Sequence, residues 1–219
     1  MIEIVNLTKS FITAGMRRYV FRDMNFVIPE GRNVAVLGRN GAGKSTLIRL
    51  LSGQDMPDSG KIVTSKSISF PVGLSGGFQG SLTGRQNVKF VARVHGCSPD
   101  RMREIVGSVE EFAELGEYFD LPVNSYSSGM RGRLAFGLSI AFDFDYYLID
   151  EALSVGDARF KKKAAHALQE RVDKSNVILV THGMGQVRQM CDMVLILNKG
   201  GEVESFDSVE DGIKAYSQI

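Results

Sequence analysis

The chain has 219 residues, of which 43% are hydrophobic and 23% are charged, and its formal net charge is +1. This length and composition indicate a globular protein with a substantial core, and the near-neutral charge excludes a broad electrostatic footprint for nucleic acid. The two cysteines, Cys97 and Cys191, have no paired or metal-binding spacing, so we expect reduced thiols.

Apolar runs in the chain are short. Those over 177–180 and 194–197 fall far below the ~20 residues that a membrane-spanning helix needs. The N-terminal segment MIEIVNLTKS is polar and strand-like, without the apolar region of a secretory signal. We therefore expect a cytosolic chain that reaches a membrane only through a partner.

The first third of the chain predicts a series of short strands around one helix. Strands are expected over 2–7, 19–28 and 33–37, with one or two more within 61–70. A glycine-rich segment follows the third strand and leads into an amphipathic helix over 46–51. Residues 12–18, between the first two strands, have the character of an insertion.

The rest of the chain predicts a helical insertion and then a return to alternating elements. Residues 71–87 are rich in Gly and Ser and indicate a loop or hinge, after which helical periodicity runs through 86–118. The later elements are a loop over 122–129, a helix over 130–142, a strand over 146–149, a helix over 157–172, strands over 177–180 and 194–197, and a polar tail with a short helix. Alternating strands and helices predict an α/β fold with a largely parallel core sheet.

A glycine-rich loop between the third strand and the first helix is the strongest chemical signal. It fits the pattern G-x-x-x-x-G-K-[ST] at every required position, in the order Gly38, Arg39, Asn40, Gly41, Ala42, Gly43, Lys44, Ser45, Thr46. Backbone amides of such a loop wrap phosphate groups, and the following helix directs its positive end at them. Lys44 is then expected to reach the β- and γ-phosphates of ATP, and the Ser45 hydroxyl to bind Mg²⁺. The alternative is a chance glycine turn before a helix.

Two carboxylates stand at the end of the apolar strand YYLI. Ligands of open α/β sheets lie at the carboxyl ends of the strands. Asp150 suits coordination of Mg²⁺, and Glu151 suits the base that polarises the attacking water. An acidic pair after a strand is also a common helix N-cap, which is the alternative for this pair.

Two further features indicate a function only in combination with the phosphate loop and the carboxylate pair. Ser127, Ser128 and Gly129 precede the helix over 130–142, and small residues at a helix start form an anion site, although alone they are an ordinary N-cap. His182 follows the strand NVILV; a strand-end histidine is more often structural, but beside a phosphate loop it suits a γ-phosphate sensor.

The order of these motifs resembles the ABC ATPase family over nearly the whole chain. The resemblance implies a P-loop NTPase of the ABC type: one domain, 1–219, whose α/β core with an antiparallel β subdomain spans 1–78 and 143–219, and whose inserted helical lobe spans 79–142. It also implies a head-to-tail dimer with a second copy, in which Ser127 and Gly129 contact the ATP of the opposite subunit. Asp157 falls at the family's D-loop aspartate.

Some positions depart from the family pattern. The signature turn reads YSSGM where the family usually has LSGGQ. By resemblance, Gln79 is the glutamine that contacts nucleotide and Mg²⁺, although it lies closer to Leu82 than the usual spacing. Phe11 fits the aromatic that stacks on adenine, Tyr19 is an alternative, and either could instead be a buried core aromatic.

Two segments resemble one branch of the family, the polysaccharide exporters. They are SVGDARFKKK, after the second carboxylate, and GGFQGSLTGRQN, before the lobe; the compact length resembles the capsular type. The resemblance implies a peripheral subunit at the cytoplasmic face of the bacterial inner membrane. There it would hydrolyse ATP to power export through a separate permease dimer, with membrane association only through that permease and without nucleic acid.

Other functions stay open at this point. The cargo could be teichoic acid, O-antigen, lipid or a drug instead of a capsular polysaccharide. A soluble ABC ATPase of translation or DNA repair is disfavoured by the single cassette and the short lobe. A regulatory module without turnover is disfavoured by Glu151, because inactive sites usually lack this base.

Overall fold

The computed structural model describes residues 1–72, 77–150 and 157–219. The strands are β1 (Ile2–Thr13), β2 (Met16–Ile28), β3 (Val34–Leu37), β4 (Ser59–Thr64), β5 (Tyr146–Asp150), β6 (Asn176–Val180), β7 (Met193–Leu197) and β8 (Val203–Phe206). The helices are α1 (Lys44–Leu51), α2 (Gly84–Val94), α3 (Pro99–Ala113), α4 (Ser128–Ile140), α5 (Ala158–Val172), α6 (Met184–Met190) and α7 (Val209–Tyr216), with short 3₁₀ turns over Gly116–Asp120 and Val123–Ser125.

The chain forms two compact units. The first comprises residues 1–71, 144–151 and 175–219, and the second comprises 72–143 and 152–174. The sequence placed the borders of the helical lobe at 79–142 and kept 157–172 in the core. Helix α5 instead packs with the helical unit, because the rings of Phe112, Phe136 and Phe160 from α3, α4 and α5 form a cluster with centroids 5.5–6.4 Å apart.

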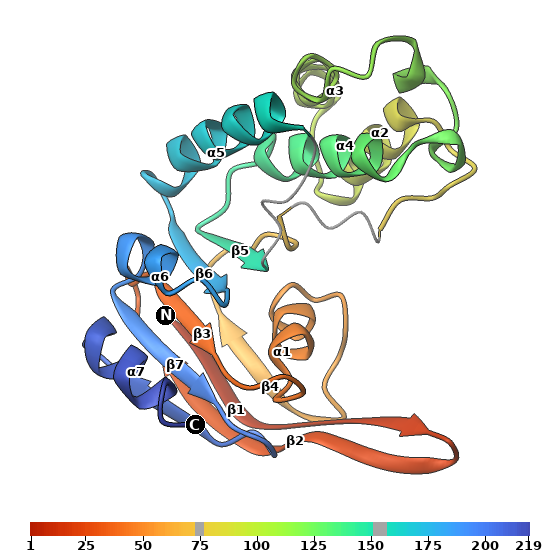
Figure 1. The fold of residues 1–219 in the computed structure, drawn as a ribbon. Helices are drawn as coiled ribbons and strands as arrows, with labels where there is room; N and C mark the ends of the chain where they lie inside the picture. Colours follow the sequence, from red (N-terminus) through yellow and green to blue (C-terminus); the bar gives the residue numbers. More distant parts are fainter. Residues whose placement is uncertain (73–76, 151–156) are drawn as a thin grey trace. The chain divides into compact units, whose positions relative to one another are not determined.

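The first unit is built on a five-stranded sheet with the order β5-β6-β3-β7-β8. Its first four strands are parallel, and β8 pairs antiparallel with β7. Strands β3 and β7 are buried at every residue, which agrees with their uninterrupted apolar sequences. Such continuous runs suit a parallel sheet that is covered on both faces, and α1 lies on one side of this sheet with α6 and α7 on the other (Figure 1). The expected mostly parallel core is therefore confirmed.

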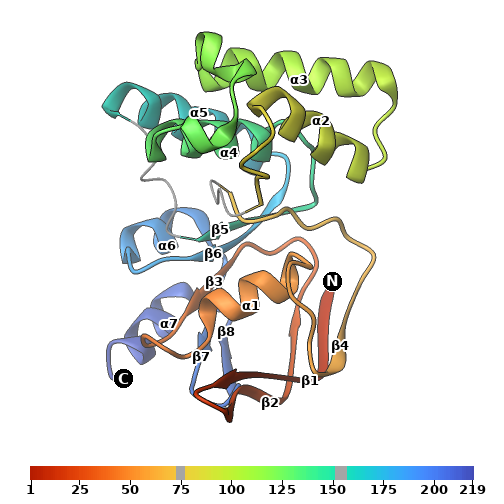
Figure 2. The ribbon, with the colours of Figure 1, turned by 90° about the vertical axis from the view of Figure 1, so that its right-hand side faces the viewer.

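A second, antiparallel sheet has the order β2-β1-β4 and is the expected β subdomain. Its inward residues Ile2, Ile4 and Leu7 join the same hydrophobic cluster as the strands of the larger sheet and the buried face of α1. Figure 2 shows β1 and β2 beneath α1. The phosphate-loop helix is thus packed between the two sheets of the unit.

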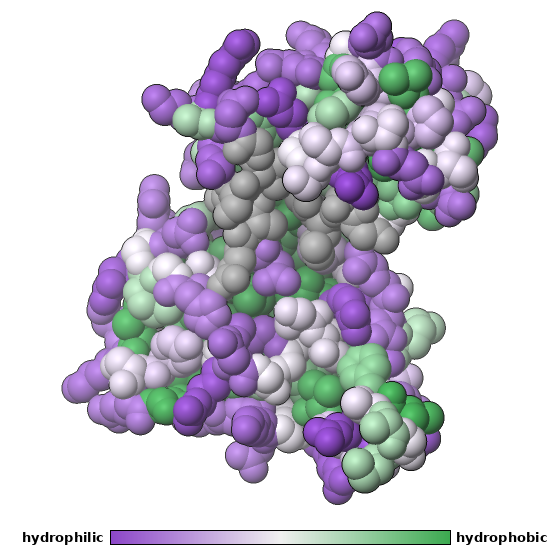
Figure 3. All heavy atoms as spheres, turned by 45° about the vertical axis from the view of Figure 1, so that its right-hand side comes forward, coloured by the Kyte–Doolittle hydropathy of each residue, from purple (hydrophilic) through white to green (hydrophobic). Residues whose placement is uncertain are grey.

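Residues 12–18, expected as an insertion, are part of a β-hairpin. Thr13 pairs with Met16, and Ala14 and Gly15 have φ of 51° and 76°. Two positive φ values at the centre of a two-residue loop are those of a type I′ turn, whose twist matches the flanking strands. The face drawn in Figure 3 is mostly hydrophilic, and hydrophobic side chains gather where this hairpin ends.

The helical unit contains an ionic network that joins its elements. The Arg85 guanidinium of α2 donates to both carboxylate oxygens of Glu110 in α3, at 2.9 and 2.6 Å, and to Asp120 at 2.7 and 3.0 Å. Helix α2 begins within the segment expected as a loop, because Thr83 and Gln86 form a capping box there. In the part of the chain that the structure describes, no helix is long and apolar enough to cross a membrane.

Candidate functional site

The loop Gly38–Gly43 connects the buried strand β3 to α1. Gly43 is the residue before the helix and has φ 105°. A Cβ atom there would lie 2.6 Å from the side chains of both Val20 and Phe21, so any other residue would strain the backbone and collide with β2. The Gly43 carbonyl accepts the Leu47 amide at 2.8 Å, which makes it the first acceptor of the helical ladder. The glycine pattern therefore sets both the turn and the position of the helix start.

Lys44 is the first residue of α1 and its side chain returns over the loop. Its Nζ donates to the Gly38 carbonyl at 2.6 Å and to the Arg39 carbonyl at 3.3 Å. Gly38 itself has no room for a side chain, because a Cβ atom would lie 2.4 Å from the Leu197 carbonyl oxygen of β7. The ammonium group and the helix N-terminus thus concentrate positive charge at the loop.

Parallel pairing aligns the strand ends that supply the other site residues. Strand β6 lies between β5 and β3, and Val180 of β6 is the register partner of both Val36 and Asp150. Asp150 is the last residue of β5, while the phosphate loop begins two residues beyond Val36. The sheet register therefore brings the carboxylate and the loop to the same edge, as the sequence predicted from parallel strand ends.

His182 stands in the turn between β6 and α6. The preceding Thr181 is 5% exposed, and its hydroxyl donates to Gln186 Oε1 at 2.8 Å and accepts the Gly183 amide at 3.0 Å. These two bonds tie the turn to the start of α6. The buried Thr181 hydroxyl therefore holds the segment on either side of His182.

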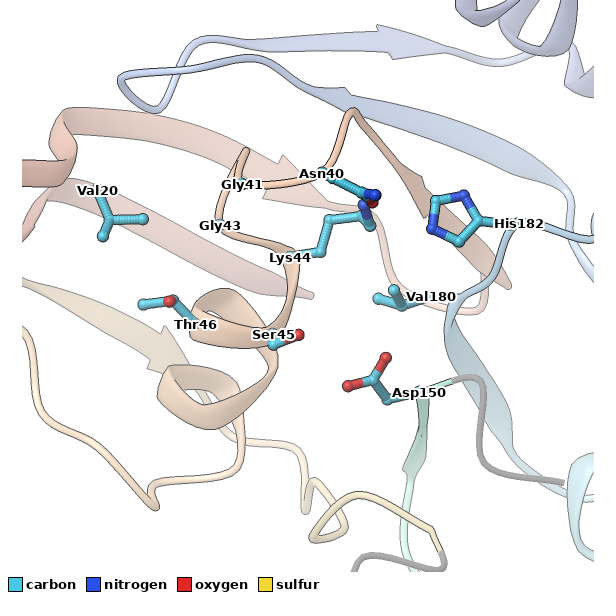
Figure 4. A pocket seen from close by; sticks show the side chains of 10 residues that line it. All are labelled: Val20, Asn40, Gly41, Gly43, Lys44, Ser45, Thr46, Asp150, Val180 and His182. Atoms are coloured by element: carbon cyan, nitrogen blue, oxygen red, sulfur yellow. The ribbon is translucent and has the colours of Figure 1, made fainter. Parts of the chain in front are cut away.

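These groups surround one pocket of about 420 Å³ (Figure 4). Its described lining residues are Val20, Asn40, Gly41, Gly43, Lys44, Ser45, Thr46, Asp150, Val180 and His182. In this view Val180 lies between the His182 ring and the Asp150 carboxylate, with Ser45 on the carboxylate side. The serine hydroxyl and the carboxylate are oxygen donors of the kind that Mg²⁺ prefers, and the loop amides and Lys44 suit phosphate. Glu151, the expected base, lies outside the described residues.

The two aromatic candidates for adenine stacking are not among the described residues that line this pocket. Phe11 lies under the cations Lys9 and Arg49, at 5.0 and 5.7 Å from the ring centroid. Tyr19 is 40% exposed and carries the Arg22 guanidinium over its ring at 4.0 Å. Val20 lines the pocket instead, and sequence reasoning missed it because only the hairpin register shows which β2 residue faces the loop.

The signature turn is in the helical unit, at the start of α4. Ser127 is the N-cap, and its Oγ accepts the Met130 amide at 3.2 Å. Ser127 and Ser128 are exposed, and a Cβ on Gly129 would have its nearest neighbour at 3.9 Å, so this helix start is open for approach. The turn therefore presents free amides next to two hydroxyl groups, a suitable surface for an anion.

Gln79 and Asp157 are the remaining candidates in the helical unit. The Gln79 backbone is held by Asn87, which is 2% exposed, through bonds of 2.8 and 3.1 Å, while its side chain is exposed. Asp157 caps α5 by accepting the Phe160 amide at 2.9 Å and pairs with Arg133 at 2.6 Å. The hydrogen bond from the Phe160 amide, together with the positive charge of Arg133, lowers the pKa of the Asp157 carboxyl. Both residues thus have local structural partners on their own element or its neighbour.

Comparison with known proteins gives a consistent picture. The family model described as ABC transporter matches residues 21–154. The polysialic acid transport ATP-binding protein KpsT of Escherichia coli is 54% identical over 216 residues, which cover 99% of this chain and 96% of that protein. The capsule polysaccharide export ATP-binding protein CtrD of Neisseria meningitidis serogroup B is 42% identical over the full length of both. Among solved structures, the dimeric post-hydrolysis state of the ATP-binding cassette MJ0796 bound to ADP and Pi has a TM-score of 0.73 at 23% identity, covering 94% of this chain and 98% of that one.

Proposed function

The chain belongs to the ABC transporter family, as an ATP-binding and ATP-hydrolysing subunit, and we propose that it powers the export of a capsular polysaccharide through a separate membrane permease. The observation that carries this proposal is the 54% identity with a polysialic acid transport protein along 99% of the chain. A likeness of this extent includes both the phosphate loop and the segments on either side of the helical lobe. Export places the chain at the cytoplasmic face of the inner membrane, held there by its permease.

In this proposal the pocket of the α/β unit binds ATP. The amides of the loop Gly38–Gly43 wrap the phosphates, and Lys44 neutralises the β- and γ-phosphates. Ser45 and Asp150 would hold Mg²⁺, which when bound would neutralise negative charge on the phosphates. His182 contacts the γ-phosphate, and Glu151 positions the attacking water. The convergence of Lys44, Ser45, Asp150 and His182 on one pocket supports these roles.

The helical unit supplies the second half of the mechanism. An open helix start at Ser127, Ser128 and Gly129 suits the γ-phosphate of ATP bound to a second copy, so two chains enclose two nucleotides. Asp157 belongs to this same dimer surface. ATP stabilises the closed dimer, and loss of the γ-phosphate removes the bridge. The work on the permease comes from the differential affinity of ATP and ADP for the closed and open states.

The test is ATP turnover of the chain purified with its permease, comparing the wild type with Glu151→Gln. We expect phosphate release to fall by a factor on the order of 10²–10⁴, since proton transfer by a positioned base contributes that much. ATP should then be retained in a dimer. Turnover at the wild-type rate would remove Glu151 from the catalytic role and contradict the proposed site.

The cargo requires a separate measurement. Deletion of the gene should abolish surface capsule while the polymer accumulates inside the cell, and expression of the wild-type chain should restore export. A normal capsule together with loss of another surface polymer, such as teichoic acid, would assign a different cargo to the same ATPase.

A further inference from the structure

The β1–β2 hairpin extends beyond the sheet that holds it. Strand β4 pairs with β1 only as far as Thr8, whose partner is Ser59. From Lys9 onward β1 has β2 as its partner, and the ribbon closes at the turn of Ala14 and Gly15. The last residues of the hairpin are therefore a two-stranded projection, and the phosphate pocket does not use them.

Apolar side chains are exposed at the end of this projection. Ile12 is 76% exposed and Met16 is 58% exposed. Ile12 is the register partner of Arg17, whereas Met16 is the partner of Thr13, the next residue along β1. Because successive residues of a strand point to opposite faces, Ile12 and Met16 stand on opposite faces of the ribbon. The tip is thus apolar on both sides, and the one face drawn in Figure 3 has hydrophobic atoms at the end of the hairpin.

Positive charge is concentrated directly behind this apolar tip. The stretch 9–22 has four cationic residues and no carboxylate, although the whole chain has a net charge of only +1. Lys9 is paired with Asp55 at 2.6 Å, and Arg22 lies over the ring of Tyr19. In residues 1–72, 77–150 and 157–219, the side chains of Arg17 and Arg18 have no hydrogen bond or ion pair. Arg17 lies within electrostatic reach of the Asp58 carboxylate, but neither guanidinium is held by a direct partner among the described residues, so both can contact an external anion.

We infer that the hairpin tip inserts into the interface of a bilayer that contains anionic lipid. In an anionic bilayer the acyl chains lie below negatively charged headgroups. The apolar groups at the convex end of the hairpin would contact the acyl chains, and the cations behind them would contact the headgroups. A stable interface with a protein partner would bury a much broader surface, roughly 800 Å² on each side. The hairpin tip has apolar groups on both faces, so no one face is a continuous apolar surface for such a partner.

A contact this small is weak by itself. One short apolar tip gives marginal, reversible binding, and stable attachment needs a second signal. The proposed permease supplies that second signal, because a subunit already held at the membrane meets lipid at a high effective concentration. The inference goes beyond the proposed function: the hairpin sets how the α/β unit is oriented against the bilayer, and the pocket still binds ATP without it.

The test is flotation of the purified full-length chain with vesicles of phosphatidylcholine, with and without phosphatidylglycerol, at increasing salt. We expect binding only to the vesicles with phosphatidylglycerol, and a decrease as salt screens the charges. Arg17→Glu with Arg18→Glu should weaken binding by a factor on the order of tenfold or more. Ile12→Asp with Met16→Asp should weaken it similarly, while the affinity for ATP in the same preparation stays unchanged.

Matched controls keep the result specific. Lys161→Glu with Lys162→Glu makes the same change of charge at two exposed lysines of α5, and Val94→Asp places an acid at a 69% exposed position of α2. Both controls should bind vesicles as the wild type does. Equal losses in controls and hairpin variants, or no binding of the wild type to anionic vesicles, would overturn the inference. So would hairpin variants that lose the permease but not the vesicles, since the partner would then be a protein. Absence of ATP binding by the wild-type chain would instead count against the proposed function.

Discussion

The candidate residues of the two units are held in different ways. In the α/β unit, Asp150 ends a buried strand, and its register partner Val180 lies two residues before His182. In the helical unit, Ser127 and Ser128 stand exposed at a helix start. Asp150 and His182 line a pocket within one chain. Ser127 and Ser128 are instead part of an exposed surface, which can act only on a ligand that another molecule brings to it. From this difference we expect that substitutions can separate nucleotide binding from nucleotide turnover.

The largest expected effect comes from Lys44→Ala in the phosphate loop. Removal of the ammonium group should lower ATP turnover on the order of 10²–10³-fold, since it removes the donor that we propose for the phosphates. Phosphate release in the assembled transporter measures the effect. The matched control is Lys61→Ala, an exposed lysine of β4 outside the pocket, which should keep wild-type turnover. A variant at Lys44 that turns over normally would contradict the site.

Asp150→Asn tests the Mg²⁺ site that we propose in the same pocket. Loss of the carboxylate should weaken the Mg²⁺-dependent part of ATP binding by about tenfold to a hundredfold, because a neutral amide is a poorer ligand for a hard cation. Titration of ATP with and without Mg²⁺ measures this. We expect little change when Mg²⁺ is absent, and an equal loss under both conditions would indicate a structural role instead.

Ser127→Ala tests the helical unit with a smaller effect. The N-cap bond to Met130 is lost, which should lower the free energy of unfolding by about 1 kcal/mol. ATP binding to the isolated chain should be unchanged, and turnover in the assembled transporter should fall. Ser128→Ala is the control for stability, since Ser128 lies inside the first turn and caps nothing. If Ser127→Ala weakened ATP binding to the monomer, the two regions would not be separable.

The smallest effect is expected away from both regions, at the Lys9–Asp55 pair. The hydrogen bond from Lys9 lowers the pKa of the Asp55 carboxyl below its ordinary value of 3.8. Its contribution to stability is therefore present above that value and is lost as the pH falls through the lower, folded-state pKa. Asp55→Asn should reduce the free energy of unfolding by about 1 kcal/mol at neutral pH, with no change in turnover. Urea unfolding at neutral and acidic pH should show the difference between variant and wild type vanishing in acid.

Several elements were predictable because their patterns are local. Strands β3, β5, β6 and β7 are short apolar runs, and their alternation with helices led to a mostly parallel sheet. Strand β8 and helix α6 were not predicted as separate elements, since β8 is largely exposed and its partner is β7. The hairpin beyond Leu7 was not predicted either, because Ala14 is an unusual residue for a positive φ.

Sequence patterns were sufficient to predict the phosphate loop, the strand-end Asp150 and His182, and the family, because each depends on residue types at fixed spacing along one segment. Only the three-dimensional structure shows that Val20 is among the described lining residues of the pocket, whereas Phe11 and Tyr19 are not, and that α5 packs with the helical unit. The physical reason is that these features depend on register and packing between segments far apart in the chain. The sequence pattern of a segment shows the periodicity of that segment, but it does not show which face of a distant strand the segment packs against.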